Sequence, residues 1–125
     1  MRIVVILTCL VLTFVSGPVL AECEGPTDVH SACAEIDAAD AQLNAAYRDI
    51  LAILDNPTPE MASHHAKAKE SLIAAQLAWQ TFRDRDCDAV FDIADGTSKV
   101  ELSGSCVAER DLQRATELRE MALQL

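Results

Sequence analysis

Apolar side chains recur every three or four residues over three segments of the chain, a spacing that is typical of amphipathic helices. The segments cover residues 32–54, 59–91 and 105–124. None of them alternates apolar and polar residues in the way that predicts a strand. We therefore predict an all-α fold, a three-helix bundle that runs up, down and up.

Each predicted helix has one apolar stripe that we expect to face the core. The stripes consist of Ile36, Leu43, Tyr47, Ile50 and Leu54 in the first segment; Met61, Ala68, Leu72, Ala75, Trp79, Phe82 and Ala89 in the second; and Val107, Asp111, Ala115, Leu118 and Ala122 in the third. Between the first two segments, Pro57 disfavours a helical Asn56, while Thr58 is a predicted cap with Pro59 at the first helical position. Residues 92–104 are rich in turn formers and predict the longest loop.

The N-terminus has the pattern of an export signal. A charge-free, mostly apolar run at residues 3–15 is too short to span a bilayer comfortably, and small or modest residues precede a cleavage point after Ala21. We predict a signal peptide at residues 1–21 and a periplasmic or secreted location. Glu22 stands before Cys23, where a lipoprotein signal needs a small residue, which argues against a lipid anchor.

Acidic residues dominate the charge, with 20 Asp and Glu against 10 Lys and Arg. Cleavage removes Arg2 alone among the charged residues, so the remaining 104 residues (22–125), read as one domain, carry a net charge of -11 instead of -10. This charge excludes unaided nucleic-acid binding and favours a basic protein as partner. We expect no stable membrane insertion after cleavage.

Four cysteines follow the predicted cleavage site, and an exported protein is expected to oxidise them. If the last two helices are antiparallel about a turn near Ser98, Cys87 lies within about one helical turn of Cys106. We therefore prefer the pair Cys87–Cys106, which leaves Cys23–Cys33 by elimination. Cys23–Cys87 is the rival pairing.

Neither histidines nor acids form a metal-binding pattern. His64 and His65 are adjacent, so their directions on a helix diverge by about 100°, and we interpret them as solvated. The acidic run at residues 84–92 lacks the glycine and terminal glutamate of a calcium loop. No catalytic motif occurs either, so we predict no metal, no cofactor and no enzymatic activity.

The most individual stretch, residues 76–87, contains the only tryptophan. Gln76, Trp79, Arg83 and Cys87 recur at spacings of three and four and so share one helical face. Arg83 can stack on Trp79 or pair with an acid of the first helix. Trp79 is then either a core anchor with Arg83 as a structural clamp, or part of a partner-binding surface.

This stretch and its surroundings resemble the LprI-like family of small exported bacterial proteins, named for a lysozyme inhibitor. The resemblance rests on Cys23, Cys33, Cys87, Cys106, Leu118, an Asp95-Gly96-Thr97-Ser98 loop, and a set that we call the family face: Leu43, Asn44, Tyr47, Gln76, Trp79, Arg83, Asp84 and Arg114. Two departures are Gly96-Thr97 in place of paired glycines and Asp111 in place of a threonine. The resemblance implies a secreted or periplasmic helical module, one branch of which inhibits lysozyme; for this chain we expect binding, and inhibition, of lysozyme.

Inhibition requires the cleft of lysozyme to be occluded, and its catalysis depends on carboxylates. The predicted loop is a candidate binding element, with Lys99 reaching a carboxylate and serines forming hydrogen bonds in the cleft; the alternative is an ordinary surface loop. The candidate binding loop comprises Asp95, Gly96, Thr97, Ser98, Lys99, Ser103 and Ser105. The alternative hypothesis is an acidic interaction module for another basic protein or a cationic peptide.

Overall fold

The structure, a computed structural model, describes residues 27–125. This part consists of helix α1 (Thr27–Leu54), helix α2 (Ala62–Ile93), a short 3₁₀ turn η1 (Gly96–Ser98) and helix α3 (Lys99–Ala122), with no strand among the described residues. The all-α prediction is confirmed. The predicted signal peptide, residues 1–21, lies outside the described residues and stays a prediction.

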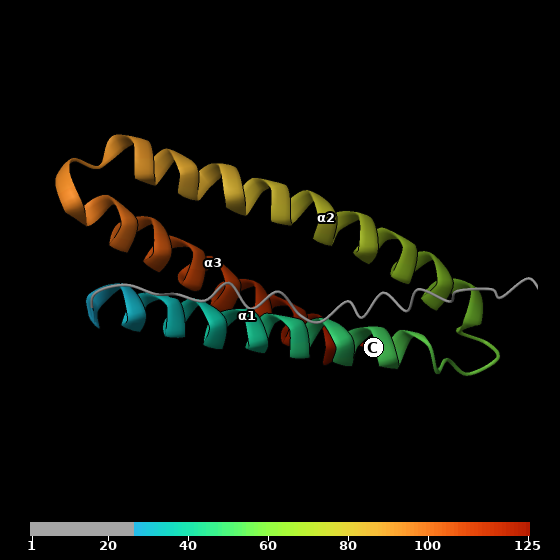
Figure 1. The fold of residues 1–125 in the computed structure, drawn as a ribbon. Coiled ribbons are helices and arrows are strands. Elements are labelled where there is room, and N and C mark those ends of the chain that lie inside the picture. The colour runs from blue at the N-terminus through green and yellow to red at the C-terminus, as the bar shows by residue number, and fades with distance from the viewer. Residues whose placement is uncertain (1–26) are drawn as a thin grey trace, which may run out of the picture.

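The three helices run up, down and up, as Figure 1 shows. Helix α3 lies alongside α1, points the same way and makes its most extensive contacts with it. Helix α2 is antiparallel to both and packs mainly on α3, while α1 and α2 contact each other least. Helix α3 is therefore the central element of the bundle.

The core lies mainly between α1 and α3, on the stripes that the sequence predicts for these helices. Its buried members are Leu43, Ala46, Ile50, Leu54, Leu72, Ala115 and Leu118. Alanines let the two helix backbones approach closely. Gly104 extends this contact, because a Cβ built there would lie 3.3 Å from Cδ1 of Ile36.

The connection from α1 to α2 differs in detail from the prediction. Helix α1 ends at Leu54, and Asn56 donates from Nδ2 to the Ala52 carbonyl at 2.7 Å. A turn follows, in which the Met61 amide donates to the Thr58 carbonyl, so α2 begins at Ala62 instead of Pro59. The carboxyl of Glu60 accepts hydrogen bonds from its own backbone and from Thr58, which lower its pKa. Thr58 therefore stabilises a turn and does not cap the helix.

Helix α2 faces the bundle with a different stripe from the predicted one. Leu72 is buried and Trp79 half-buried, as predicted, but Phe82 is 53% exposed and Met61 is 43% exposed. The three predicted alanines, Ala68, Ala75 and Ala89, are exposed as well. The stripe that packs against α3 is instead polar and aromatic and contains the α2 part of the family face.

The predicted loop at residues 92–104 is wrong for most of its length. Helix α2 continues to Ile93, and α3 begins at Lys99, so Lys99, Ser103 and Ser105 are helical. Gly96 has φ of +72°, the left-handed conformation that glycine favours, and provides the predicted turn. Gly104 does not form a turn, because its lack of a side chain accommodates Ile36 within a helix–helix contact.

Candidate functional site

The family face is organised around Trp79, which is half-buried between α2 and α3 and packs against the core. Two guanidinium groups lie over its ring, that of Arg83 at 5.5 Å and that of Arg114 at 5.9 Å from the ring centroid. A cation close to an indole ring is attracted to the negative ring face, so both contacts are favourable. The ring thereby links a residue of its own helix to one of α3.

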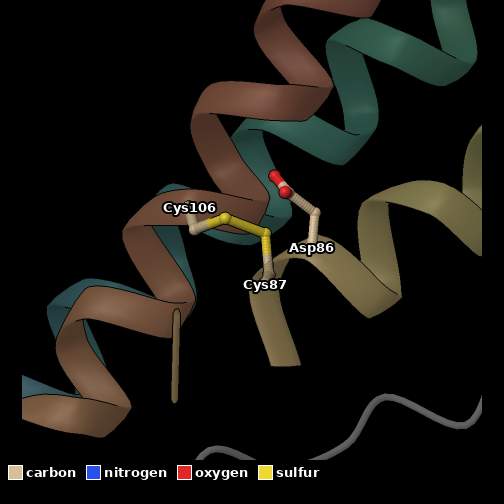
Figure 2. A group of neighbouring side chains, drawn as sticks. All are labelled: Asp86, Cys87 and Cys106. Carbon is tan, nitrogen blue, oxygen red and sulfur yellow. A yellow bond between two sulfur atoms is a disulfide. The ribbon is translucent and has the colours of Figure 1, made fainter. Parts of the chain in front are cut away.

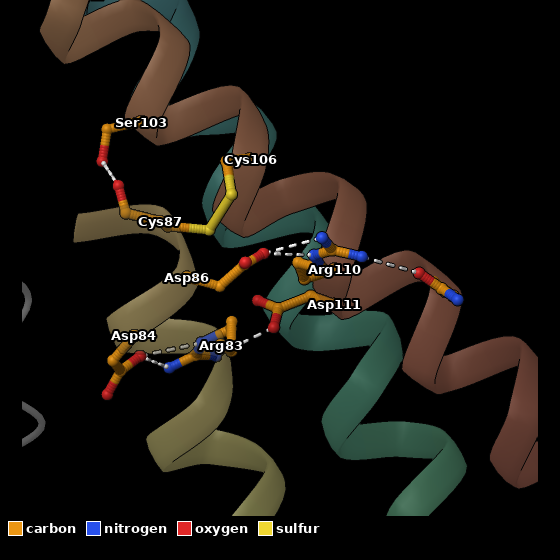
Figure 3. The surroundings of a disulfide bond; sticks show 9 residues. Arg83, Asp84, Asp86, Cys87, Ser103, Cys106, Arg110 and Asp111 are labelled. Atoms are coloured by element: carbon orange, nitrogen blue, oxygen red, sulfur yellow. Dashed lines mark hydrogen bonds and ion pairs between the residues drawn. A yellow bond between two sulfur atoms is a disulfide. The ribbon is translucent and has the colours of Figure 1, made fainter. Parts of the chain in front are cut away.

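Arg83 joins α2 to α3 through an ion pair that is largely removed from solvent. Its Nη1 donates to Oδ1 of Asp111 at 2.8 Å, and its Nε and Nη2 donate to Oδ1 of Asp84 at 3.0 and 2.8 Å (Figure 3). The sequence suggested an acid of the first helix as one possible partner, but the partner across the interface belongs to α3. The signal was present in the sequence, because Asp111 is the one acid on the predicted apolar stripe of its helix.

Asp111 is fully buried, and its second carboxylate oxygen, Oδ2, has no hydrogen-bond partner among the described residues. Burial raises the pKa of Asp111, the hydrogen bond and charge of Arg83 lower it, and the charges of Asp40 and Asp84 raise it, with a net increase. Burial also lowers the pKa of Arg83, but its hydrogen bonds to the two aspartates more than compensate and raise it overall. The positive charge of Arg83 and the negative charge of Asp111 therefore compensate each other inside the helix interface.

The other members of the family face complete the contact among the helices. Nε of Arg114 donates to Oε1 of Gln76 at 3.1 Å, and its Nη1 donates to Glu117 at 2.9 Å. Leu43 is buried in the core and Tyr47 packs against it. Asn44 is exposed and donates to Asp40 at 2.7 Å. The guanidinium groups of the family face thus already have partners within the chain.

A disulfide joins α2 to α3 beside this face. Cys87 and Cys106 are bonded, with their Cα atoms 5.6 Å apart, which confirms the preferred pair and makes the rival pair Cys23–Cys87 wrong. The hydroxyl of Ser103 donates to the Cys87 carbonyl at 3.2 Å, and Arg110 binds Asp86 at 2.7 and 2.9 Å (Figure 3). The predicted pair Cys23–Cys33 includes a residue outside the described range and stays a prediction.

Asp86, Cys87 and Cys106 are close enough together to suggest a metal site, since their ligand atoms lie within 4.8 Å of one another (Figure 2). The two sulfurs are bonded to each other, however, and a metal binds the thiolate. The Asp86 carboxylate is taken up by Arg110. Cys87 and Cys106 therefore form a cross-link, and Asp86 beside them forms an ion pair with Arg110.

The histidines differ from the prediction. His64 is exposed as expected, but His65 is buried, and neither of its ring nitrogens has a hydrogen-bond partner in the part of the chain described. The interpretation of both as solvated is wrong for His65, which lies one position further along the helix and so turns toward the bundle.

Charge is distributed unevenly between the interfaces and the outer surface. Among residues 27–125, five basic residues form ion pairs with acids: Lys69, Arg83, Arg85, Arg110 and Arg114. Many exposed carboxylates have no hydrogen bond or ion pair within the described residues: Glu35, Asp37, Asp49, Glu70, Asp92, Asp95, Glu101, Glu109 and Glu120. The arginines between the helices are thus neutralised within the chain, and many unpaired acids face outward.

The sequence model of the lysozyme inhibitor LprI family matches residues 23–118. The chain belongs to the LprI family. It is 37% identical over 95 residues to a protein of Rhizobium meliloti described as uncharacterized, an alignment that covers 71% of this chain and 68% of that protein. No solved structure matches the chain.

The match to the LprI family includes the whole family face and the Cys87–Cys106 bond. The structure brings all members of this face to the junction of the three helices except the exposed Asn44 and Asp84 at its rim. It does not bring the candidate binding loop to this junction, because Asp95, Gly96, Thr97 and Ser98 form the exposed tip between α2 and α3. None of the described helices is long and apolar enough to cross a membrane.

Lys99 follows the tip, and its ammonium lies over the Phe91 ring, 4.7 Å from the centroid. An ammonium at the edge of the molecule that contacts an exposed ring can leave it for a carboxylate of another protein at small cost. Lys99 makes no ion pair with any residue that the structure describes. The tip therefore retains one cation among surrounding acids.

Proposed function

We propose that this chain is an exported, non-catalytic protein that binds a basic lysozyme and inhibits it. The observation that carries the proposal is the match to the lysozyme inhibitor LprI family over residues 23–118. Export rests on the predicted signal peptide at residues 1–21.

The distribution of charge supports a basic partner. Opposite net charges steer two proteins together and raise the association rate, an effect that added salt screens. The carboxylates available for this are those of the outer surface, since the ion pairs lie between the helices or along them. An account based on charge alone fits any cationic protein, so inhibition is the property that identifies the partner.

Inhibition requires a feature that blocks the cleft of the enzyme. The exposed tip at residues 95–98 with Lys99 is the part of the candidate loop that still projects from the bundle. The disulfide nearby holds the ends of α2 and α3 together, so the tip is presented on a rigid support. Lys99 would approach a catalytic carboxylate of lysozyme. The hydroxyl of Ser103 already donates a hydrogen bond to the Cys87 carbonyl, so we do not assign Ser103 a role in binding.

The test is an assay of cell-wall hydrolysis by egg-white lysozyme and by lysozymes of other types, with the purified chain after removal of residues 1–21. We expect inhibition that increases with the concentration of the chain and weakens in Lys99→Ala. Lys67→Ala, which removes an exposed cation from α2, is the matched control and should inhibit like the wild type. Absence of inhibition across all lysozyme types, or capture of a different cationic partner instead, would overturn the proposal.

A further inference from the structure

A groove of about 360 Å³ runs between α1 and α3. Its floor is formed by the small side chains of Ala39 and Ala108, which are buried, and Leu112 forms an apolar wall that is 41% exposed. Glu35 of α1 and Glu109 of α3 line the same groove. An apolar channel between two helices is thus bordered by one carboxylate from each helix.

The groove is lined by residues of α1 and α3 alone, and Ser105 and Glu109 separate it from the hollow beside α2. Its α3 residues recur at spacings of three and four from position 105 to 112, whereas Cys106, Arg110 and Arg114 of the same helix bind residues of α2. Neither the family face nor the disulfide occupies it. The helix α2 therefore leaves this surface open to a partner.

The carboxylates of the groove differ from those at the neighbouring interface. Asp86 is neutralised by Arg110, and both line a second hollow on the α2 side, which Glu109 borders as well. Glu35 and Glu109 are exposed and have no ion pair or hydrogen bond with any described residue. Two unneutralised carboxylates over an apolar floor complement a long cationic side chain, because its methylene groups can contact the floor while its head group meets the charges.

We propose that this groove binds an arginine side chain of the basic partner. The stem lies on Ala108 and Leu112, and the guanidinium donates to Glu35 and Glu109. Arginine fits better than lysine, since its planar group presents several donors and can serve two carboxylates at once. This inference rests on the proposed function, because that function supplies the basic partner, and it names the surface that the partner uses.

The experiment measures binding by calorimetry with two probes, egg-white lysozyme and a short oligo-arginine peptide. Glu35→Gln with Glu109→Gln removes both charges and keeps the shape of the side chains. The control, Glu101→Gln with Glu120→Gln, removes the same charge from exposed positions outside the groove. A third variant, Ala38→Phe, fills the groove from an exposed position without changing charge.

We expect the groove variants to weaken the binding of both probes about tenfold or more, and the control to weaken it by no more than about threefold. Circular dichroism should show equal helicity in all variants, since all substituted positions are exposed. If lysozyme binds the wild type but the groove and control variants behave alike, the groove is refuted and the proposed function stands. If only the peptide binds, in a groove-dependent way, the groove stands and the proposed function fails. If neither probe binds, both are refuted.

Discussion

Replacing Arg83 should lower the free energy of unfolding much more than replacing its ion-pair partner Asp111. The side chain of Asp111 is 1% exposed, and its one hydrogen-bond partner in the described part of the chain is Arg83. Arg83 is 18% exposed and keeps Asp84 and the Trp79 ring if Asp111 is removed. The test compares Arg83→Met, Asp111→Leu and the variant with both changes, which replace the charged groups by apolar ones.

Arg83→Met leaves a buried carboxylate without a hydrogen-bond partner. Breaking a buried pair in this way costs about 3–5 kcal/mol, a large part of the roughly 5–15 kcal/mol by which a domain is stable. Asp111→Leu removes a charge that was itself unfavourable to bury and leaves the guanidinium with Asp84, so it should cost only about 1–2 kcal/mol. The double variant removes both charges and should be more stable than Arg83→Met alone.

The assay measures unfolding in urea by the loss of the helical circular dichroism signal. Tryptophan fluorescence is not used, because the substitutions change the surroundings of Trp79. Because burial raises the pKa of Asp111, acid conditions protonate it and should shrink the deficit of Arg83→Met. Equal costs for the two single variants, or a double variant no more stable than Arg83→Met, would refute the reasoning.

Three further predictions concern stability. Replacing Cys87 and Cys106 by alanine opens a bridge across a sequence separation of 19 and should lower the free energy of unfolding by about 3 kcal/mol; no measurable loss in urea unfolding would contradict this. The folded pKa of Asp111 is raised, so its contribution to stability is present in acid and is lost as the pH rises from the ordinary aspartate pKa through the raised one. The stability of the wild type relative to Asp111→Asn should therefore fall over that window, and a difference independent of pH would count against it. His65→Leu should raise the free energy of unfolding by about 1 kcal/mol, because a buried imidazole without partners is replaced by an apolar group, whereas the exposed control His64→Leu should have almost no effect; destabilisation by His65→Leu would show a missed partner.

The sequence predicts the first and third helices well because their cores consist of apolar residues at helical spacing. Leu43, Ile50 and Leu54 are buried as predicted, and so are Ala115 and Leu118. The Cys87–Cys106 bond also follows from this register, since two antiparallel helices about the predicted turn near Ser98 place Cys87 within about one helical turn of Cys106. Helical period and one turn thus suffice for this part of the fold.

The second helix is predicted less well because its buried face is not its most apolar face. Gln76 is buried and Phe82 is exposed, whereas a prediction based on burying apolar area would bury Phe82 and expose Gln76. Gln76 is accommodated because Arg114 donates to its side chain from another helix. This pairing depends on how α3 packs against α2. The spacing of residues along α2 alone cannot predict it.

The predicted loop at residues 92–104 is too long because serine and glycine occur in helices as well as in turns. Ser103 and Gly104 are typical of turns, but here Ser103 bonds to the Cys87 carbonyl and Gly104 admits Ile36. The groove between α1 and α3 was missed for a related reason. Glu35 and Glu109 are ordinary surface acids in the sequence, and only the parallel packing of their helices places them on one groove.

The claim that outward carboxylates bind a basic lysozyme is tested most directly by the dissociation constant of the wild-type chain, after removal of residues 1–21, for egg-white lysozyme at low and at physiological salt. The account predicts a saturable complex at both, weaker by about tenfold at the higher salt because the charges are screened. A chain that is folded but shows no saturable binding at low salt, or binding that salt does not weaken, would contradict it.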